Sequence, residues 1–206
     1  MHFTSLAIFA GAVASASAAA LAPRAGITTY TLTAESDDPK INNGVISARY
    51  NKLWVSLPES IKDAECGQAP NVEWESPVAT VFLKKAFSDQ LFLYHGSDSP
   101  QQFVVNYLKN YRSNLSYTYY SHGNGAFGAW AIASDSQRLS FDGKQFLACA
   151  QPDGSYSLSV WSSNSSPKDK DCSLIYIRAT EKPNPVPCEY SDEPLTEADL
   201  LKLANL

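Results

Sequence analysis

The clearest structural signal in the chain lies in residues 128–162, which read GAWAIASDSQRLSFDGKQFLACAQPDGSYSLSVWS. Four short runs in this segment are rich in aromatic and aliphatic side chains, and many of their positions alternate between apolar and polar. The pairs Asp142-Gly143 and Asp153-Gly154 are typical of hairpin turns. The segment is therefore predicted to form short β-strands joined by hairpins.

Similar runs lie on both sides of this segment, nearly all bounded by Gly, Pro, Asn, Asp or Ser residues. No segment before residue 190 keeps a helical period for ten residues. We therefore expect an all-β fold with one domain, which is a β-barrel, a β-trefoil or a sandwich. The further predicted strands are residues 28–34, 45–57, 79–85, 90–96, 102–108, 117–121 and 173–179.

An internal similarity bears on the choice among these three folds. Residues 79–94 and 128–143 each read as a strand, a polar loop and a second strand. A similar strand opens near Tyr30, 52 residues before Phe82, and Trp130 follows Phe82 by 48 residues. Three units of this length would suit a β-trefoil. Any series of hairpins gives similar spacings, however, so the three folds remain alternatives.

The first 20 residues, called the leader below, have the sequence features of a secretory signal peptide. Residues 6–13 form a short apolar core, and Ala18 and Ala20 occupy the positions of an A-x-A cleavage site. The apolar run is too short to cross a bilayer, which takes about 20 residues. We expect residues 1–20 to be removed and the product to be secreted and extracellular, with its all-β domain at 27–190.

The last part of the chain changes character. Four prolines in residues 181–194 predict an extended segment that leaves the sheet. Residues 191–206 are predicted to be an acidic tail with a short helix, because Thr196 and Asp199 have the spacing of a capping box.

Four cysteines follow the leader, at Cys66, Cys149, Cys172 and Cys188. An even number in a secreted chain predicts two disulfides, and no pair has the C-x-x-C spacing of a zinc site. Three pairings are open. We favour Cys149 with Cys172, which closes a loop around one hairpin, and Cys66 with Cys188, which ties the early part of the domain to the proline-rich exit.

Two sequons, Asn114-Leu115-Ser116 and Asn164-Ser165-Ser166, are candidate glycosylation sites. Both lie in stretches rich in serine and asparagine, which are typical of exposed loops. We therefore expect Asn114 and Asn164 to carry glycans in the secreted protein.

Composition excludes several function classes. The 206 residues include 16 Lys and Arg against 21 Asp and Glu, a net charge of −5, so we expect neither nucleic acid nor a membrane surface as a partner. No G-x-S-x-G, H-E-x-x-H or P-loop motif occurs, and His95 and His122 are the only histidines after the leader. We expect no catalytic residues, no metal site and no cofactor.

Aromatic side chains are dense between residues 103 and 130. Most are expected to fill a β core, where alternate positions of a strand face the interior. The segment from Tyr119 to Asn124 is the exception, because Ser, Gly and Asn suggest a surface loop. Exposed aromatic faces stack on sugar rings, so Tyr119, Tyr120 and His122 are candidate carbohydrate contacts. The aromatic residues are Phe103, Tyr107, Tyr111, Tyr117, Tyr119, Tyr120, Phe127 and Trp130.

A set of residues in the second half of the chain has a family pattern. Its members are Trp130, Ile132, Leu139-Ser140-Phe141, Gly143-Lys144, Phe146, Ala148, Cys149, Val160-Trp161, Cys172, Arg178, Cys188 and Tyr190. With the strands before it, this pattern resembles the fungal cell wall protein PhiA family over residues 79–190. The chain resembles a diverged member, because it lacks a cysteine near the mature N-terminus and carries a Tyr-rich segment at 107–120. The resemblance implies a secreted wall protein and transfers no catalytic residue.

Sequence and resemblance together favour a secreted, non-enzymatic protein of the fungal cell wall or extracellular matrix, with wall polysaccharide as the expected partner. The alternative is a secreted carbohydrate-binding, lectin-like module or effector that uses the Tyr-rich loops. A third interpretation, a small secreted hydrolase, has no motif in its support.

Overall fold

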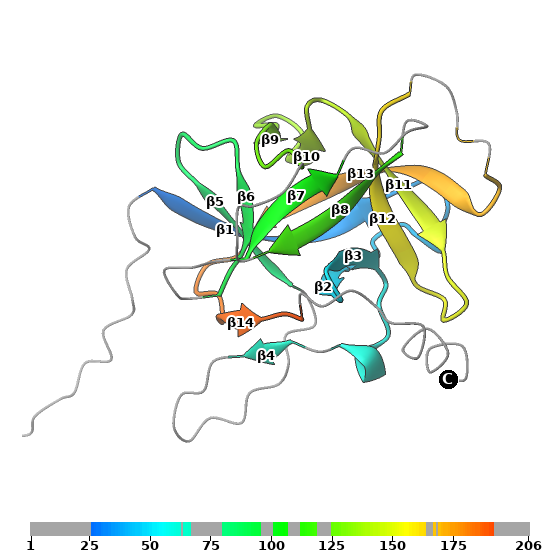
Figure 1. Ribbon diagram of the computed structural model, residues 1–206, viewed down its shortest axis with the longest axis horizontal. Helices are drawn as coiled ribbons and strands as arrows, with labels where there is room; N and C mark the ends of the chain where they lie inside the picture. Colours follow the sequence, from blue (N-terminus) through cyan, green and yellow to red (C-terminus); the bar gives the residue numbers. More distant parts are fainter. Residues whose placement is uncertain are drawn as a thin grey trace, which may run out of the picture.

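The computed structural model describes residues 26–62, 64–66, 80–95, 101–106, 112–118, 125–163, 167 and 169–191 (Figure 1). This part of the chain is all-β, as predicted, and its one helical element is the 3-10 turn η1 (Glu59–Ile61). The strands are β1 (Ile27–Glu35), β2 (Ile46–Arg49), β3 (Lys52–Val55), β4 (Glu65–Cys66), β5 (Val81–Lys85), β6 (Leu91–Leu93), β7 (Gln102–Asn106), β8 (Arg112–Thr118), β9 (Trp130–Ile132), β10 (Arg138–Phe141), β11 (Gln145–Ala150), β12 (Tyr156–Trp161), β13 (Cys172–Glu181) and β14 (Cys188–Glu189).

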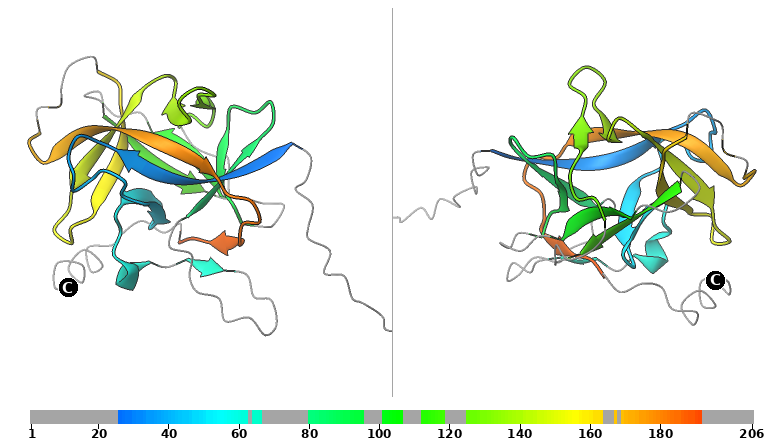
Figure 2. Two further views of the ribbon diagram at one scale, coloured as in Figure 1. Left: turned by 180° about the vertical axis from the view of Figure 1, so that it is seen from behind. Right: turned by 45° about the horizontal axis from the view of Figure 1, so that its top comes forward.

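Eight of these strands form a closed antiparallel barrel. Pairing runs from β1 through β5, β6, β7 and β8 to β12, and then through β11 and β13 back to β1. Figure 1 and Figure 2 show β1 and β13, the strands that close the ring, running side by side. Among the three alternatives, the circuit of paired strands identifies a barrel.

The remaining strands extend or flank the ring. The β2–β3 hairpin adds to the edge of β12 beside β8, and the β9–β10 hairpin adds to β13 beside β11. The segments 79–94 and 128–143, which look alike in sequence, are therefore both hairpins. The short strands β4 and β14 pair with each other below the barrel in Figure 1.

The ten-residue strand β13 shows why the sequence folds this way. Ile175, Ile177 and Ala179 are buried, whereas the residues that alternate with them, Tyr176, Arg178 and Thr180, are exposed. This alternation is the period of a strand with one face on a core. Its length lets one edge pair with β1 while the other pairs with β11 and then β10.

Two predicted strands have different bounds in the structure. The run 45–57 is a hairpin, because Tyr50 and Asn51 turn the chain with φ values of 50° and 57°. Asparagine tolerates this left-handed conformation, which a two-residue hairpin turn requires at both positions. The strand predicted at 117–121 overlaps the end of β8, which begins already at Arg112, and residues 119–121 lie outside the described residues. The predicted turn at Asp142-Gly143 is confirmed, with φ values of 51° and 67°.

The barrel interior is filled by aromatic rings. Phe103 stacks on Phe82 with ring centroids 5.5 Å apart and meets the edge of Trp130 at 6.1 Å. Trp130 in turn meets Phe141 edge-on at 5.1 Å and stacks on Phe146 at 6.3 Å. All five rings are at most 2% exposed. An eight-stranded barrel is just wide enough for such side chains to fill it.

Both disulfides join opposed residues of neighbouring strands. Cys149 on β11 pairs with Cys172 on β13, and Cys66 on β4 pairs with Cys188 on β14. This is the pairing that the sequence favoured. The helix predicted within the tail 191–206 lies outside the described residues, as do the predicted leader and its cleavage site.

Candidate functional site

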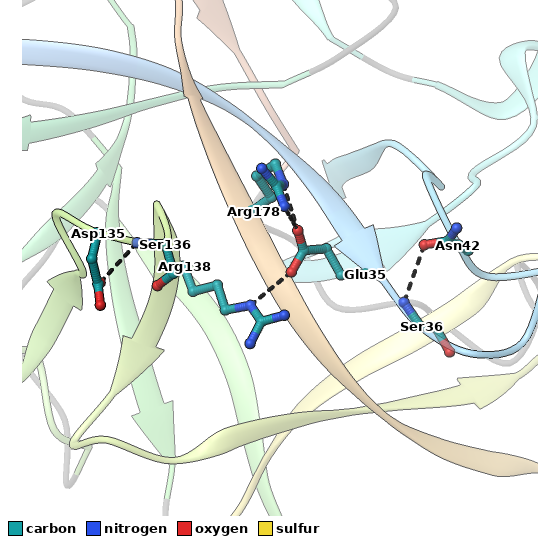
Figure 3. A network of polar contacts seen from close by, with 7 residues as sticks. All are labelled: Glu35, Ser36, Asn42, Asp135, Ser136, Arg138 and Arg178. Atoms are coloured by element: carbon teal, nitrogen blue, oxygen red, sulfur yellow. Dashed lines mark hydrogen bonds and ion pairs between the residues drawn. The ribbon is translucent and has the colours of Figure 1, made fainter.

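Because aromatic side chains fill the described part of the barrel interior, a partner of this part would meet the outer surface. The main polar cluster there consists of Glu35 on β1, Arg138 on β10 and Arg178 on β13 (Figure 3). The Nε of Arg138 donates to Oε2 of Glu35 at 2.7 Å, and Arg178 donates to Oε1. One carboxylate thus accepts from two guanidinium groups that come from two other strands.

Strand register explains the cluster. Arg138 lies directly opposite Arg178 in the β10–β13 pair, an arrangement of like charges that is unfavourable in a sheet. Glu35 lies opposite Tyr176 on the other edge of β13, two residues along from Arg178 and therefore on the same face of the sheet. Its carboxylate therefore reaches both arginines and compensates their repulsion.

Two opposing effects determine the protonation of Glu35. Burial of the carboxyl group raises its pKa, but hydrogen bonds from Arg138 and Arg178 and their positive charges outweigh burial. The pKa of Glu35 consequently lies below its ordinary value, and the group stays ionised at neutral pH. A carboxylate held in this form is poorly suited to act as a general acid, so the arrangement is that of an ion cluster.

An exposed aromatic ring borders the cluster. The side chain of Tyr176 is 42% exposed, and the guanidinium of Arg138 lies 3.9 Å from the centre of its ring. Arg138 therefore contacts a carboxylate and an aromatic face at once. The surface combines hydrogen-bond donors, acceptors and one ring, and carries a net charge of +1 from Glu35, Arg138 and Arg178.

The predicted carbohydrate contacts Tyr119, Tyr120 and His122 lie outside the described residues, as does the sequon residue Asn164. The other sequon residue, Asn114, has an exposed side chain in the middle of β8. A predicted loop position is thus a strand position that faces outward.

Tyr117, two residues before the candidate loop, is held by hydrogen bonds at both its side chain and its backbone. Tyr117 is completely buried, and its hydroxyl donates to the carbonyl of Ser191 at 2.5 Å. Its backbone N–H donates to Oδ1 of Asn51 at 2.7 Å. The aromatic-rich segment of the sequence therefore divides into core residues, among them Phe103, Tyr117 and Trp130, and residues that the structure does not describe.

Sequence reasoning did not single out Phe87, at the tip of the β5–β6 hairpin. Its side chain is fully exposed, at 110% of the reference area, and its backbone has a φ of 58°. The only signal for it in the sequence is a phenylalanine within the polar run KKAFSDQ.

The described residues hold neither a cluster of metal-ligating side chains nor a membrane-spanning helix. No three His, Cys, Asp or Glu side chains gather closely enough to hold a metal ion. No helix in this part of the chain has the length and apolar character needed to cross a membrane.

Comparison with known proteins gave one match. A family model described as PhiA-like secreted protein matches residues 30–191, from the first barrel strand to the end of the described domain. No curated protein and no solved structure matches the chain.

Proposed function

Since the chain belongs to the family of PhiA-like secreted proteins, we propose that it is a non-enzymatic structural protein of the fungal cell wall or extracellular matrix. In this role the barrel serves as a compact, cross-linked body that associates with wall polysaccharide through its surface. It requires no cofactor and no catalytic group.

The filled barrel interior is the observation that carries this proposal. Phe82, Phe103, Trp130, Phe141 and Phe146 occupy the space in which a barrel of this size would otherwise enclose a small ligand. The polar cluster on the outside supports the same view, because Glu35 is ionised and engaged by two arginines. Two cross-strand disulfides suit an extracellular setting.

The direct test is retention of the purified secreted protein on isolated fungal walls, insoluble β-glucan and chitin. We expect retention on walls, competition by a soluble fragment of the retaining polymer, and no release of reducing sugar during prolonged incubation. A protein that stays in the supernatant with all three materials would contradict a wall role. Release of sugar above that of a heat-denatured control would contradict the non-enzymatic role.

A second candidate function is a lectin-like module that uses the loop with Tyr119, Tyr120 and His122. The anchoring of Tyr117 to Asn51 and Ser191 favours it, because a fixed strand end positions the residues that follow. Recognition of a soluble oligosaccharide separates this function from association with an insoluble wall. Binding of a defined oligosaccharide in calorimetry, lost in loop variants, is the expected result for a lectin.

A further inference from the structure

The β5–β6 hairpin stands out from the barrel in Figure 1. Phe87 at its tip presents an aromatic ring to solvent. Phe87 is one of two large exposed hydrophobic side chains in the described part of the chain, and it is far more exposed than the other, Tyr176. Full exposure means that both faces of the Phe87 ring are open. A single exposed apolar residue is ordinary on a protein surface, so exposure alone assigns no role.

The backbone at Phe87 supplies a second, independent observation. Residues 85–88 form a turn in which the N–H of Ser88 donates to the carbonyl of Lys85 at 3.2 Å. Phe87 is the third residue of this turn and has a φ of 58°, a conformation that glycine or asparagine adopts readily and phenylalanine does not. The residue thus exposes apolar surface and strains the backbone at one position. Eight other non-glycine residues of the described chain also have a positive φ, but none of them carries a large, fully exposed apolar side chain.

The charges around the tip indicate what kind of partner fits. The Nζ of Lys84 donates to the carbonyl of Ser88 at 2.6 Å, and a carboxylate oxygen of Asp89 accepts from the N–H of Ala129 at 3.0 Å. The ammonium of Lys85 lies 4.8 Å from the centre of the Phe92 ring. Lys84 and Asp89 carry opposite charges that offset each other, so the exposed Lys85 leaves the tip with a net charge of only +1. An uncharged partner with an apolar face therefore fits the tip better than an anionic surface.

We propose that Phe87 is a contact residue that stacks on the pyranose rings of a β-linked wall polysaccharide. Sugar rings of such polymers are uncharged and present C–H groups on their faces, which pack against an aromatic face. A ring on a projecting hairpin reaches the flat surface of an insoluble polymer, which a recessed ring would not. This proposal rests on the wall role proposed above, and it assigns the contact with the polysaccharide to Phe87.

The variant Phe87→Asn separates binding from folding, because asparagine suits the left-handed conformation and lacks the ring. Its thermal midpoint should equal or exceed that of the wild type. Its apparent Kd for insoluble β-1,3-glucan or chitin should be about tenfold weaker, a loss typical of an important contact residue. Phe87→Trp should retain binding, and Glu181→Gln, which changes an exposed side chain at the end of β13, should bind as the wild type does. Phe87→Gly provides a second variant with a compatible backbone.

The outcomes are distinct. Weaker binding of Phe87→Asn and Phe87→Gly at unchanged stability supports the contact. The polymer to which these variants bind more weakly, glucan or chitin, is then the polymer that Phe87 contacts. Equal retention of wild type and both variants overturns the contact and leaves the wall role standing. No retention of the wild type on any wall material overturns both. Binding instead to vesicles of phosphatidylcholine and phosphatidylserine, lost in the variants, overturns the polysaccharide partner in favour of a lipid surface.

Discussion

At the scale of single residues, Glu35 has the most clearly defined role on the surface. Replacing it with glutamine leaves Arg138 and Arg178 facing each other without a compensating charge. Because both arginines are substantially exposed, we expect the free energy of unfolding to fall by only roughly 0.5–1 kcal/mol. High salt should shrink the loss, since it screens exposed charges.

Urea unfolding at low and high ionic strength measures this effect. Glu181→Gln, which removes an exposed glutamate from the end of the same strand β13, is the matched control. An equal loss in the control, or a loss that salt leaves unchanged, would contradict the role of the cluster.

The same residue predicts a pH dependence. The pKa of Glu35 is lowered in the native state by its two arginine partners against the effect of burial. Its contribution to stability is therefore fully present above the ordinary glutamate pKa, about 4.3, and is lost as the pH falls through the lower native value. The stability difference between wild type and Glu35→Gln should be constant near neutral pH and vanish in strong acid. A thermal melting series across this range checks it, and a difference that persists in strong acid would refute it.

The loop tyrosines give a third prediction at this scale. If Tyr119 and Tyr120 stack on sugar, Tyr119→Ala and Tyr120→Ala weaken retention on glucan while the thermal midpoint stays unchanged, and salt has little effect on binding. If either belongs to the core, its alanine variant instead loses roughly 3–5 kcal/mol of stability. Melting and glucan retention measured on both variants separate the two roles. If both variants melt and are retained like the wild type, the two tyrosines belong neither to the core nor to a sugar-binding site.

At the scale of elements, Tyr117 joins the β2–β3 hairpin to β8. Its hydroxyl donates to Ser191 and accepts from the N–H of Asn51 at 3.2 Å. Tyr117→Phe keeps the ring and removes these bonds, so we expect a loss of about 1–2 kcal/mol. Chemical unfolding measures it, with the exposed Tyr176→Phe as control. A loss of the same size in the control would show that the buried hydroxyl has no special role.

Most strands were predictable from the sequence, because alternation and turn residues are local signals. The break at Tyr50-Asn51 was not, since neither residue is glycine and the flanking runs read as one strand. The early part of β8 was also missed, because its outward positions are polar and only Ser113, Leu115 and Tyr117 face the interior.

The candidate site was beyond sequence reasoning for a different reason. Glu35 is separated from Arg138 by 103 residues and from Arg178 by 143. Only the register of β1, β10 and β13 brings the three together, and register is a property of the folded sheet. Phe87 was missed because a lone aromatic residue in a polar run gives no indication of backbone conformation.

At the scale of the whole molecule, one disulfide joins two strands of the barrel and the other joins β4 to β14 beside it. Cys66 and Cys188 are 122 residues apart in the chain, whereas Cys149 and Cys172 are 23 apart. If constraint of the unfolded chain dominates, replacing the first pair with serine costs more stability than replacing the second, within a range of about 2–5 kcal/mol. Thermal melting of the two double variants compares them, and a larger loss for Cys149 and Cys172 would contradict this order.

Because all four cysteines are paired in the two disulfides, thiol titration of the denatured, unreduced wild type should read near zero.

The closing contact between β1 and β13 has a consequence for how the protein is made. The Thr29 hydroxyl donates to the carbonyl of Lys182, a partner 153 residues later in the chain. The first strand can pair early with β5 along one edge, but its partner along the other edge, β13, is synthesised much later. Contacts so distant in sequence slow folding, because a long loop must close before they contribute stability. The barrel can close only once β13 has been synthesised, and until then one edge of β1 is unpaired and can accept strands from other chains.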